Sequence, residues 1–374
     1  MKRTTLLLAL CLMLTSTGCG SPQPETAPPT VADLFDNTAT LSSESTFSTQ
    51  ATEATVPTPS FASISSITEF GLPEYQLDEI GHYVAYEGGE MHLPYSFTYS
   101  GSKLSEYGIA IMLFLDGQLQ PFRTSENDTL QNVHILYPEE STGSKTVTLD
   151  LIFTPVAGSS GDTFDLTILS RQCPTWKWEH NPAGISEDTS SITTRLKLFH
   201  TPPDPVLPAV HDRLISWSCE YTDASHSEYK AWEGNSMAKL SACMRISGAG
   251  YTTDDSLLGN QYLFSVTPDT HMELTMELLN TSGVEYGIVV FVDNQPISVE
   301  PDDLIIIDAT PGQKANLTVQ VDMSTFEEYS RVYAVVVPRN YLATFGYTSE
   351  EVFDVTTTDQ VYLFSAHSWA ESLK

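Results

Sequence analysis

Basic residues are scarce in this sequence. Its 374 residues include 17 Lys and Arg against 48 Asp and Glu, which makes the formal net charge −31. No Lys or Arg occurs between Arg3 and Lys103, and the acidic residues are spread along the chain instead of forming a tail. A surface this negative repels nucleic acid and anionic lipid headgroups, so both are excluded as partners of the folded body. We interpret the acidity as a source of solubility.

The short motifs of catalysis and metal binding are also missing. The sequence has no Gly-x-Ser-x-Gly turn, no phosphate-binding glycine loop, no His-Glu-x-x-His pair and no calcium-binding loop. Its nine histidines are dispersed. We therefore predict that the protein is not an enzyme and uses no cofactor and no metal. The alternative that remains open is an extracellular glycan or peptide hydrolase with a carboxylate-based site.

The apolar run at the N-terminus, Leu6–Leu14, is too short to span a bilayer. It follows two basic residues, Lys2 and Arg3, and leads to the small residues that precede Cys19. A positive start, a short apolar stretch and a small-residue cleavage site are typical of a signal peptide. We predict a signal peptide over residues 1–18.

The segment Ser16-Thr17-Gly18-Cys19 resembles the lipobox of bacterial lipoproteins, although that family usually has Leu where Ser16 stands. The resemblance implies that the signal is cleaved before Cys19 and that its thiol is lipidated, with palmitate among the acyl chains. It also implies a lipid anchor on the extracytoplasmic face of the cell membrane. The alternative is an ordinary secretory signal that is cut nearby.

Ser, Thr, Pro and Ala dominate the sequence from Ser21 to Ser66. Such a composition buries too little apolar surface to offset the entropy of ordering the chain. We predict that residues 19–70 are a disordered tether, with a root-mean-square span of about 40 Å if the chain is flexible. The tether would hold a folded body near the membrane.

Five cysteines occur in the sequence. Cys11 leaves with the signal and Cys19 is assigned to the lipid, so Cys173, Cys219 and Cys243 remain, an odd number in an exported chain. We predict a disulfide between Cys219 and Cys243, with Cys173 as a buried thiol. Three reduced, buried cysteines are an equally open alternative.

An internal repeat is the main indication of the fold. The segment Tyr83–Ile109 aligns without a gap on Tyr262–Ile288, and both reach the tetrapeptide Glu-Tyr-Gly-Ile. Apolar and polar residues alternate in the same phase in the two copies, which is typical of a strand with one buried face. The two copies place His92 and His271 at equivalent positions.

The repeat continues beyond this segment. Asp116-Gly117 in the first copy answers Asp293-Asn294 in the second, and each pair tolerates the positive φ that a tight hairpin requires. A later strand also recurs, as Gly143–Leu151 and Gly312–Val321. The two copies thus share several strands in one order.

We predict an all-β chain with two tandem antiparallel β-sandwich domains of about seven strands each. The pattern resembles the immunoglobulin-like modules of bacterial surface proteins. Four prolines near residues 200–212 predict a stiff linker between a first domain at 71–199 and a second at 213–374. Residues 213–260 have no recognised counterpart in the first copy, and we predict a helix or hairpin there, with helical periodicity between Ser225 and Arg245.

Two side-chain groups are candidates for ligand binding. Trp176 and Trp178 flank Lys177 and form either a platform for sugar rings or apolar surfaces, or an anchor buried in the sandwich. The polar face that carries His92, Ser96 and Thr98 is a candidate recognition surface if it is exposed.

The combined features predict a surface-anchored bacterial lipoprotein that acts as an extracellular binding or scaffolding module. Its predicted partners are the membrane, through the lipid on Cys19, and a protein or glycan outside the cell. A solute-binding lipoprotein fits poorly, because the bodies of that class are usually α/β.

Overall fold

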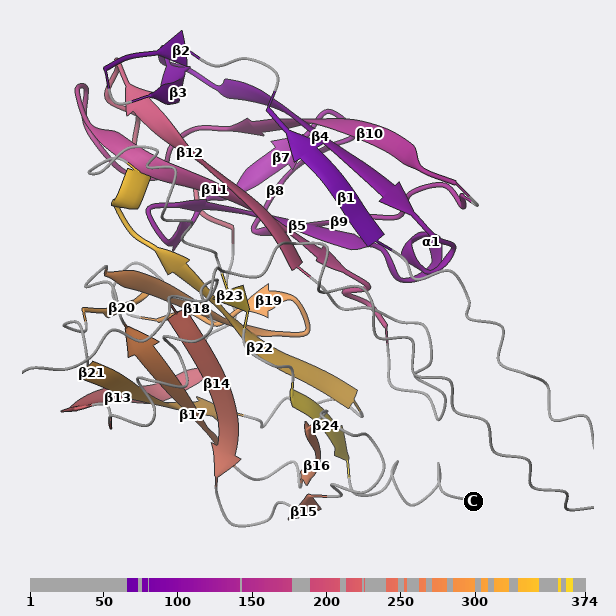
Figure 1. Cartoon of the computed structure of the whole chain (residues 1–374), viewed down its shortest axis with the longest axis vertical. Coiled ribbons are helices and arrows are strands. Elements are labelled where there is room, and N and C mark those ends of the chain that lie inside the picture. Colours follow the sequence, from indigo (N-terminus) through magenta and orange to yellow (C-terminus); the bar gives the residue numbers. More distant parts are fainter. Residues whose placement is uncertain are drawn as a thin grey trace, which may run out of the picture. The chain divides into compact units, whose positions relative to one another are not determined.

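The fold is described by a computed structural model (Figure 1). It describes residues 66–72, 76–79, 81–141, 143–176, 189–208, 213–223, 225, 240–247, 252–253, 262–266, 271–280, 285–299, 304–308, 313–322, 329–342, 356–357 and 361–365.

The first half of the described chain forms two sheets that face each other. One sheet contains, in spatial order, β1 (Ser66–Gly71), β4 (Met91–Ser100), β10 (Lys145–Phe153), β7 (Phe122–Thr124) and β8 (Asn127–Gln131). The other contains β2 (Gln76–Leu77), β3 (His82–Tyr86), β12 (Thr189–Leu198), β11 (Thr163–Gln172), β5 (Ile109–Leu115) and β6 (Gln118–Leu119), with β9 (Val133–Leu136) paired to β5. A short helix, α1 (Lys103–Tyr107), joins β4 to β5.

The second half repeats this arrangement. One sheet contains β13 (Leu214–Asp223), β21 (Gln313–Asp322), β17 (His271–Asn280) and β14 (Leu240–Ser247). The other contains β15 (Thr252–Thr253), β16 (Tyr262–Val266), β24 (Val361–Ser365), β22 (Tyr329–Pro338), β18 (Tyr286–Val292) and β19 (Gln295–Pro296), with β20 (Ile305–Ile307) paired to β18 and β23 (Thr356–Thr357) paired to β22. The prediction of two tandem antiparallel β-sandwiches is confirmed, but two details are corrected: each sandwich has twelve described strands and not about seven, and each contains one parallel pair, β3–β12 and β16–β24.

The duplication extends to the strand register. Leu93 pairs with Leu151 across β4 and β10, and Met272 pairs with Val321 across β17 and β21. The sequence alignment places Leu93 on Met272, and Leu151 and Val321 end the recurring later strand. A register error of one residue would turn the apolar residues outward, so the agreement shows one architecture used twice.

Two strands within residues 213–260 do have counterparts in the first sandwich, contrary to the sequence prediction. β14 and β15 take the places of β1 and β2 in the sheet order. β13 pairs with β21 in the position that β7 has beside β10, but it comes earlier in the chain than β7 does, so it is an added strand. The predicted helix is wrong for residues 240–245, which belong to β14. Leu-Ser-Ala-Cys-Met-Arg-Ile-Ser alternates with period two over this strand, and that alternation favours a strand over a helix.

Each sandwich has its own core. On β4 the inward residues Tyr95 and Phe97 are buried, with Phe97 1% exposed, whereas His92 on the other face is exposed. Burial raises the pKa of Tyr95 to about 12, and its hydroxyl lies 2.8 Å from the Ser170 hydroxyl. The phase predicted for this strand is confirmed. The second core is built in the same way around Leu274, Met276 and their neighbours.

The predicted hairpin turns are also confirmed. Leu115 pairs with Gln118 and Val292 with Gln295, so each loop has two residues. The first loop has φ values of 54° at Asp116 and 80° at Gly117, and the loop at residues 293–294 has values of 51° and 61°. Positive φ at both loop residues matches the right-handed twist of the flanking strands.

A third core joins the two sandwiches. The outward faces of β5 and β11 pack against the outward faces of β18 and β22, so β5 and β18 are buried on both sides. This core comprises Ala110, Met112, Phe114, Leu119, Leu169, Val289, Phe291, Leu304, Tyr333, Val335 and Val337. Within it the rings of Phe291 and Tyr333 stack with centroids 5.0 Å apart, and the guanidinium of Arg171 lies 4.0 Å from the centroid of the Tyr333 ring.

Each hairpin turn forms a hydrogen bond with a residue just past a strand end of the other sandwich. The Asp116 carboxylate accepts a hydrogen bond from the Asn340 amide (2.7 Å), and on the opposite side the Asn294 side chain donates to the Pro174 carbonyl (2.9 Å). Equivalent turns thus contact equivalent strand ends, although through different turn residues, and the arrangement resembles an isologous interface within one chain. Burial raises the pKa of Asp116, although its contacts with Asn340 and Arg339 act in the opposite direction.

The third core bears on whether each sandwich can fold on its own. Residues 59–374 form one compact unit, in which the two sandwiches are not separated. The boundaries predicted at residues 71, 199 and 213 stay predictions, but a separately expressed half would expose the apolar face of the third core.

The phase of β4 predicts a contrast between neighbouring residues. Phe97→Ala should lower the free energy of unfolding by about 3–5 kcal/mol, because it truncates a buried aromatic side chain. Ser96→Ala, on the outward face, should change it by less than about 0.5 kcal/mol. Urea denaturation of the two variants measures both, and equal small effects would contradict the assignment of the core.

The third core predicts that Gly287→Ala is destabilising. A Cβ at Gly287 would lie 2.8 Å from the carbonyl oxygen of Gly117 and 2.9 Å from its Cα, atoms of the other sandwich. Overpacking of this kind costs about 1–3 kcal/mol. Gly143→Ala is the control, because a Cβ there meets nothing within 4 Å. If the two variants have the same denaturation midpoint, the sandwiches are not in contact at Gly287.

Candidate functional site: a cleft beside the linker

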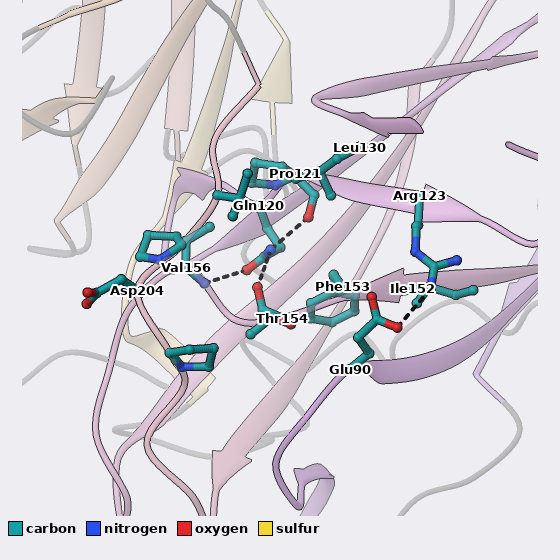
Figure 2. A pocket seen from close by; sticks show the side chains of 13 residues that line it. Glu90, Gln120, Pro121, Arg123, Leu130, Ile152, Phe153, Thr154, Val156 and Asp204 are labelled. Carbon is teal, nitrogen blue, oxygen red and sulfur yellow. Dashed lines mark hydrogen bonds and ion pairs between the residues drawn. The ribbon is translucent and has the colours of Figure 1, made fainter. Parts of the chain in front are cut away.

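A cleft of about 250 Å³ lies where the linker passes the first sandwich. Strands β7, β8 and β10, the loops beside them and the start of the linker contribute its lining, and Figure 2 shows the side chains around it. It is lined by Glu90, Gln120, Pro121, Arg123, Leu130, Ile152, Phe153, Thr154, Val156, Pro203, Asp204, Pro205 and Val206.

Hydrogen bonds fix the start of the linker to the first sandwich. The amide of Phe199 donates to the Tyr86 carbonyl (3.0 Å), and the hydroxyl of Ser160 donates to the Phe199 carbonyl (2.8 Å). Two residues after Phe199, the Thr201 hydroxyl accepts a hydrogen bond from the Ser160 amide (3.0 Å). Pro203 and Pro205 then restrict the backbone to an extended course. The linker is therefore a fixed wall as well as a connector.

The floor of the cleft is preformed around one buried amide. Gln120 is 0% exposed, and its side chain donates to the carbonyls of Pro121 (2.9 Å) and Thr154 (3.0 Å). The same side chain accepts a hydrogen bond from the Val156 amide (2.9 Å). A buried amide with its hydrogen bonds satisfied fixes the segments that it joins, so this floor needs no rearrangement before a ligand enters.

One end of the cleft is polar. Arg123, 24% exposed, pairs with Glu90 (2.8 Å) and with Asp128 (3.3 Å). Half-exposed ion pairs of this kind add little stability, but they hold the guanidinium in place. Glu90 and Asp128 together carry one negative charge more than Arg123, and Asp204 adds another, so the rim is net negative.

The remainder of the lining is apolar. Leu130, Phe153 and Val156 line the cleft together with the prolines of the linker, and Val206, which also lines it, is 79% exposed. Mostly apolar walls with a few fixed polar groups are typical of ligand pockets. In the cleft Glu90 is ion-paired with Arg123, and among the described residues no group of three or more His, Cys, Asp or Glu could hold a metal ion. The cleft can bind an apolar group beside a polar or basic one.

The outward face of β4 and β10 is an exposed polar surface. His92 lies 2.8 Å from Asp150, Ser96 bonds Thr148 (2.7 Å) and Thr98 bonds Thr146 (2.9 Å). The hydroxyls satisfy one another across the strands, so this face is a regular ladder of polar side chains. It is exposed, as the hypothesis of a recognition surface requires.

The other predicted site residues are distributed as follows. Trp176 is 2% exposed and packs in the first core, which contradicts the platform and agrees with the buried anchor. Trp178, Lys177 and Cys19 lie outside the described residues. Cys173 is buried and carries a thiol.

The predicted disulfide between Cys219 and Cys243 is not formed. Cys219 lies on β13 and Cys243 on β14, the two outer strands of one sheet, with β21 and β17 between them. At about 4.8 Å per strand their backbones are about 14 Å apart, whereas a disulfide needs Cα atoms within about 7 Å. Cys219 is a thiol in the structure. Partial burial raises the pKa of this thiol, which makes it a poor nucleophile.

Sequence reasoning missed the cleft. Its lining comes from five separate stretches of chain, and the only signal was the proline cluster, which predicted a connector but not a wall.

No helix in the described part of the chain is long and apolar enough to cross a membrane.

No protein-family model and no curated protein matches the chain. Among solved structures, the CupB6 tip adhesin from Pseudomonas aeruginosa is 12% identical, with 81% of this chain and 98% of that chain covered and a TM-score of 0.20. A putative membrane-anchored protein from Corynebacterium diphtheriae is 9% identical, with 79% and 58% covered and a TM-score of 0.21. The collagen adhesin of S. aureus is 7% identical, with 82% and 94% covered and a TM-score of 0.18. At these TM-scores the superpositions carry no inference about the present chain.

Proposed function

We propose that the protein is a lipid-anchored binding module on the extracytoplasmic face of a bacterial membrane. The observation that carries the proposal is the preformed cleft between Gln120, Arg123 and the linker. The lipobox-like sequence at Cys19 supports the anchor, and the Ser/Thr/Pro/Ala-rich stretch after it supports a tether that lets the body reach a partner.

The chemistry of the cleft indicates the class of partner. Its apolar walls fit a side chain of Leu or Phe size, and its lining includes the carboxylates of Glu90 and Asp204. The carboxylate of Asp128 pairs with Arg123 beside them. The chain as a whole has a formal charge of −31, which attracts basic segments and repels acidic ones. The proposed partner is an extended protein segment in which an apolar residue is flanked by basic residues. No observation in the described cleft favours the hydrolase alternative.

The lipid anchor is tested by metabolic labelling with a fatty-acid analogue. The intact protein should be labelled, and Cys19→Ser should not be, because it lacks the thiol that would carry the lipid. Cys11→Ser is the matched control, since it changes a cysteine within the predicted signal and should leave labelling intact. Equal labelling of wild type and Cys19→Ser would contradict the anchor.

The cleft is tested by partner recovery. The intact protein, Leu130→Glu and Thr148→Glu are purified from detergent-solubilised membranes, and the proteins that accompany each are quantified by mass spectrometry. Leu130→Glu places a charge in the apolar wall and should reduce recovery of the partner by about tenfold or more, equivalent to about 1.4 kcal/mol of binding free energy.

Thr148→Glu is the matched control, because it adds the same charge to the outward face of β10, away from the cleft. It should leave recovery unchanged. A synthetic peptide of the recovered partner should then show the same order of affinities. Equal recovery with all three proteins would place the binding site elsewhere.

A further inference from the structure

β13 forms one outer edge of its sheet and, with ten residues, is the longest edge strand of the described chain. Among the described strands it pairs with β21 alone, and one bulge, between Leu214 and Ser216, interrupts the pairing. Alternate residues of an edge strand direct their backbone amides and carbonyls away from the sheet, where a further strand can bond them. Eight of the ten residues of β13 are exposed. Within the described part of the chain, this edge is therefore open.

The corresponding position of the first sandwich is filled. There β7 lies beside β10 and β8 lies beyond β7, and both strands come from the segment 120–132 between β6 and β9. In the second sandwich the segment between β19 and β20, residues 297–304, is shorter, and β13 takes the position beside β21. None of the described strands takes the position that corresponds to β8, so this sheet can accept one more strand.

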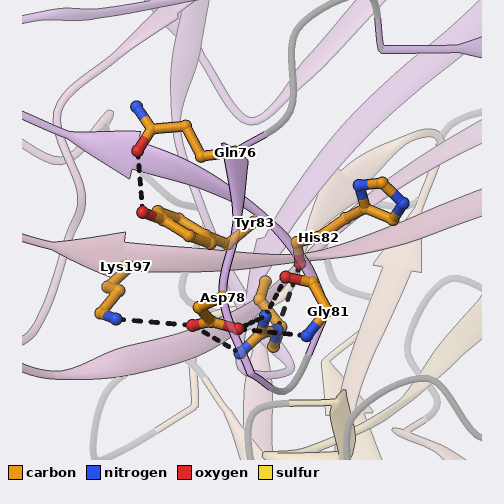
Figure 3. Close-up of polar contacts among 7 residues, drawn as sticks. Gln76, Asp78, Gly81, His82, Tyr83 and Lys197 are labelled. Atoms are coloured by element: carbon orange, nitrogen blue, oxygen red, sulfur yellow. Dashed lines mark hydrogen bonds and ion pairs between the residues drawn. The ribbon is translucent and has the colours of Figure 1, made fainter.

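The β2 edge of the first sandwich shows how an edge is closed. β2 has two residues, and Figure 3 shows the turn after it gathered around Asp78. The Arg195 guanidinium bonds both carboxylate oxygens of Asp78 (2.5 and 3.3 Å) and the Gly81 carbonyl (2.6 Å). Lys197 reaches the same carboxylate (3.4 Å). Short edge strands, charged side chains and proline hinder the addition of a strand, whereas β13 is long and contains no Lys, Arg or Pro.

One face of β13 carries an apolar row. Three of its residues lie opposite buried residues of β21: Trp217 opposite Val319, Cys219 opposite Leu317 and Tyr221 opposite Ala315. Because directly opposite residues of an antiparallel pair point to the same face, this row extends the core row of the sheet to its edge. Leu317 is 0% exposed, but Trp217 is 38% and Tyr221 43% exposed. An apolar row that stays exposed at an edge is typical of an interaction surface.

The charges of this edge indicate which kind of strand fits it. β13 carries Glu220 and Asp223, whereas β21 carries Asp322 and Lys314, so the two strands together are net negative. Glu220 lies opposite Asn316, on the face away from the core. A second copy of the chain would bring a further formal charge of −31 to this edge and is disfavoured. A segment with apolar residues in its inward row and basic residues in its outward row matches both faces.

We propose that the outer edge of β13 binds an extended segment of another protein, which adds to this four-stranded sheet as an antiparallel fifth strand. The backbone of the segment bonds β13, its apolar side chains cover Trp217 and Tyr221, and its basic side chains lie beside Glu220. Backbone bonds supply affinity in this mode of binding, and the alternate side chains supply specificity. The site belongs to the second sandwich and does not depend on the cleft of the first.

The test uses two synthetic peptides of one sequence, in which Lys alternates with Val or Phe over about ten residues, the length of a long strand. One peptide is N-methylated at its Lys residues and the other at its apolar residues, so charge and composition are matched. Only alternate amides of an added strand face β13, so one peptide keeps the amides that bond it and the other loses them. In calorimetric titrations of the whole chain at about 0.15 M salt, one peptide should bind about tenfold or more tightly than the other.

Two aromatic substitutions locate the site. Trp217→Ala removes an exposed aromatic side chain from the row on β13 and should weaken binding of the tighter peptide about tenfold or more. Tyr137→Ala is the matched control, because Tyr137 is 55% exposed on the first sandwich, and it should leave the affinity unchanged. Leu130→Glu, which alters the cleft, should also leave it unchanged. Urea denaturation shows that each variant is folded.

Cys219 reports on the same site without any substitution, because it lies between Trp217 and Tyr221 in the row. Its alkylation by iodoacetamide is followed by mass spectrometry with and without the tighter peptide. With the peptide at about ten times its Kd, mass action leaves roughly a tenth of the sites free, so alkylation of Cys219 should slow about tenfold.

Three results would overturn the proposal: equal affinities of the two methylated peptides, unchanged alkylation of Cys219, or loss of binding in Leu130→Glu. A dimer of the whole chain in analytical ultracentrifugation that Trp217→Ala abolishes would also overturn it, because a second copy would then occupy the edge. The measurements involve neither the lipid nor the partner of the cleft, so their failure is distinct from a failure of the proposed function.

Discussion

The packing of β5 and β11 against β18 and β22 is the contact on which the other features of the body depend. It buries the second face of two central strands and sets the distance between the end of β12 and the start of β13. The linker must cover that distance, and its prolines cannot fold into a compact loop. The course of the linker, and with it the wall of the cleft, follows from this packing.

The same contact explains the composition of the central strands. Ile-Ala-Ile-Met-Leu-Phe-Leu in β5 and Tyr-Gly-Ile-Val-Val-Phe-Val in β18 have no polar face, as expected for strands covered on both sides. Where the β5–β6 turn approaches the start of β18 in the other sandwich, only glycine fits, since Gly117 and Gly287 meet backbone to backbone. The acidic exterior thus keeps the protein soluble, whereas the apolar faces of the central strands join the two sandwiches.

The sequence predicted much of the fold but little of the site. The alternation through Tyr95 and Phe97 predicted which face of β4 is buried, and the turns that begin with aspartate predicted two hairpins. Both are local signals. The cleft was missed because its lining combines a buried amide, a surface ion pair and a proline segment from distant stretches. The ion pair between Asp78 and Arg195 was missed for the same reason, since 117 positions in the sequence separate the two residues.

By itself the sequence determined that this chain is built of two copies of one β-unit. A strand with one buried face shows its period locally, and the two copies show it twice. Only the tertiary structure decided which cysteines, tryptophans and charges meet. Cys219 and Cys243 are assigned to opposite edges of a sheet by strand order, Trp176 is buried by the strands around it, and Arg195 finds Asp78 through parallel pairing. Strand order and pairing depend on contacts between distant segments, and no local pattern records them.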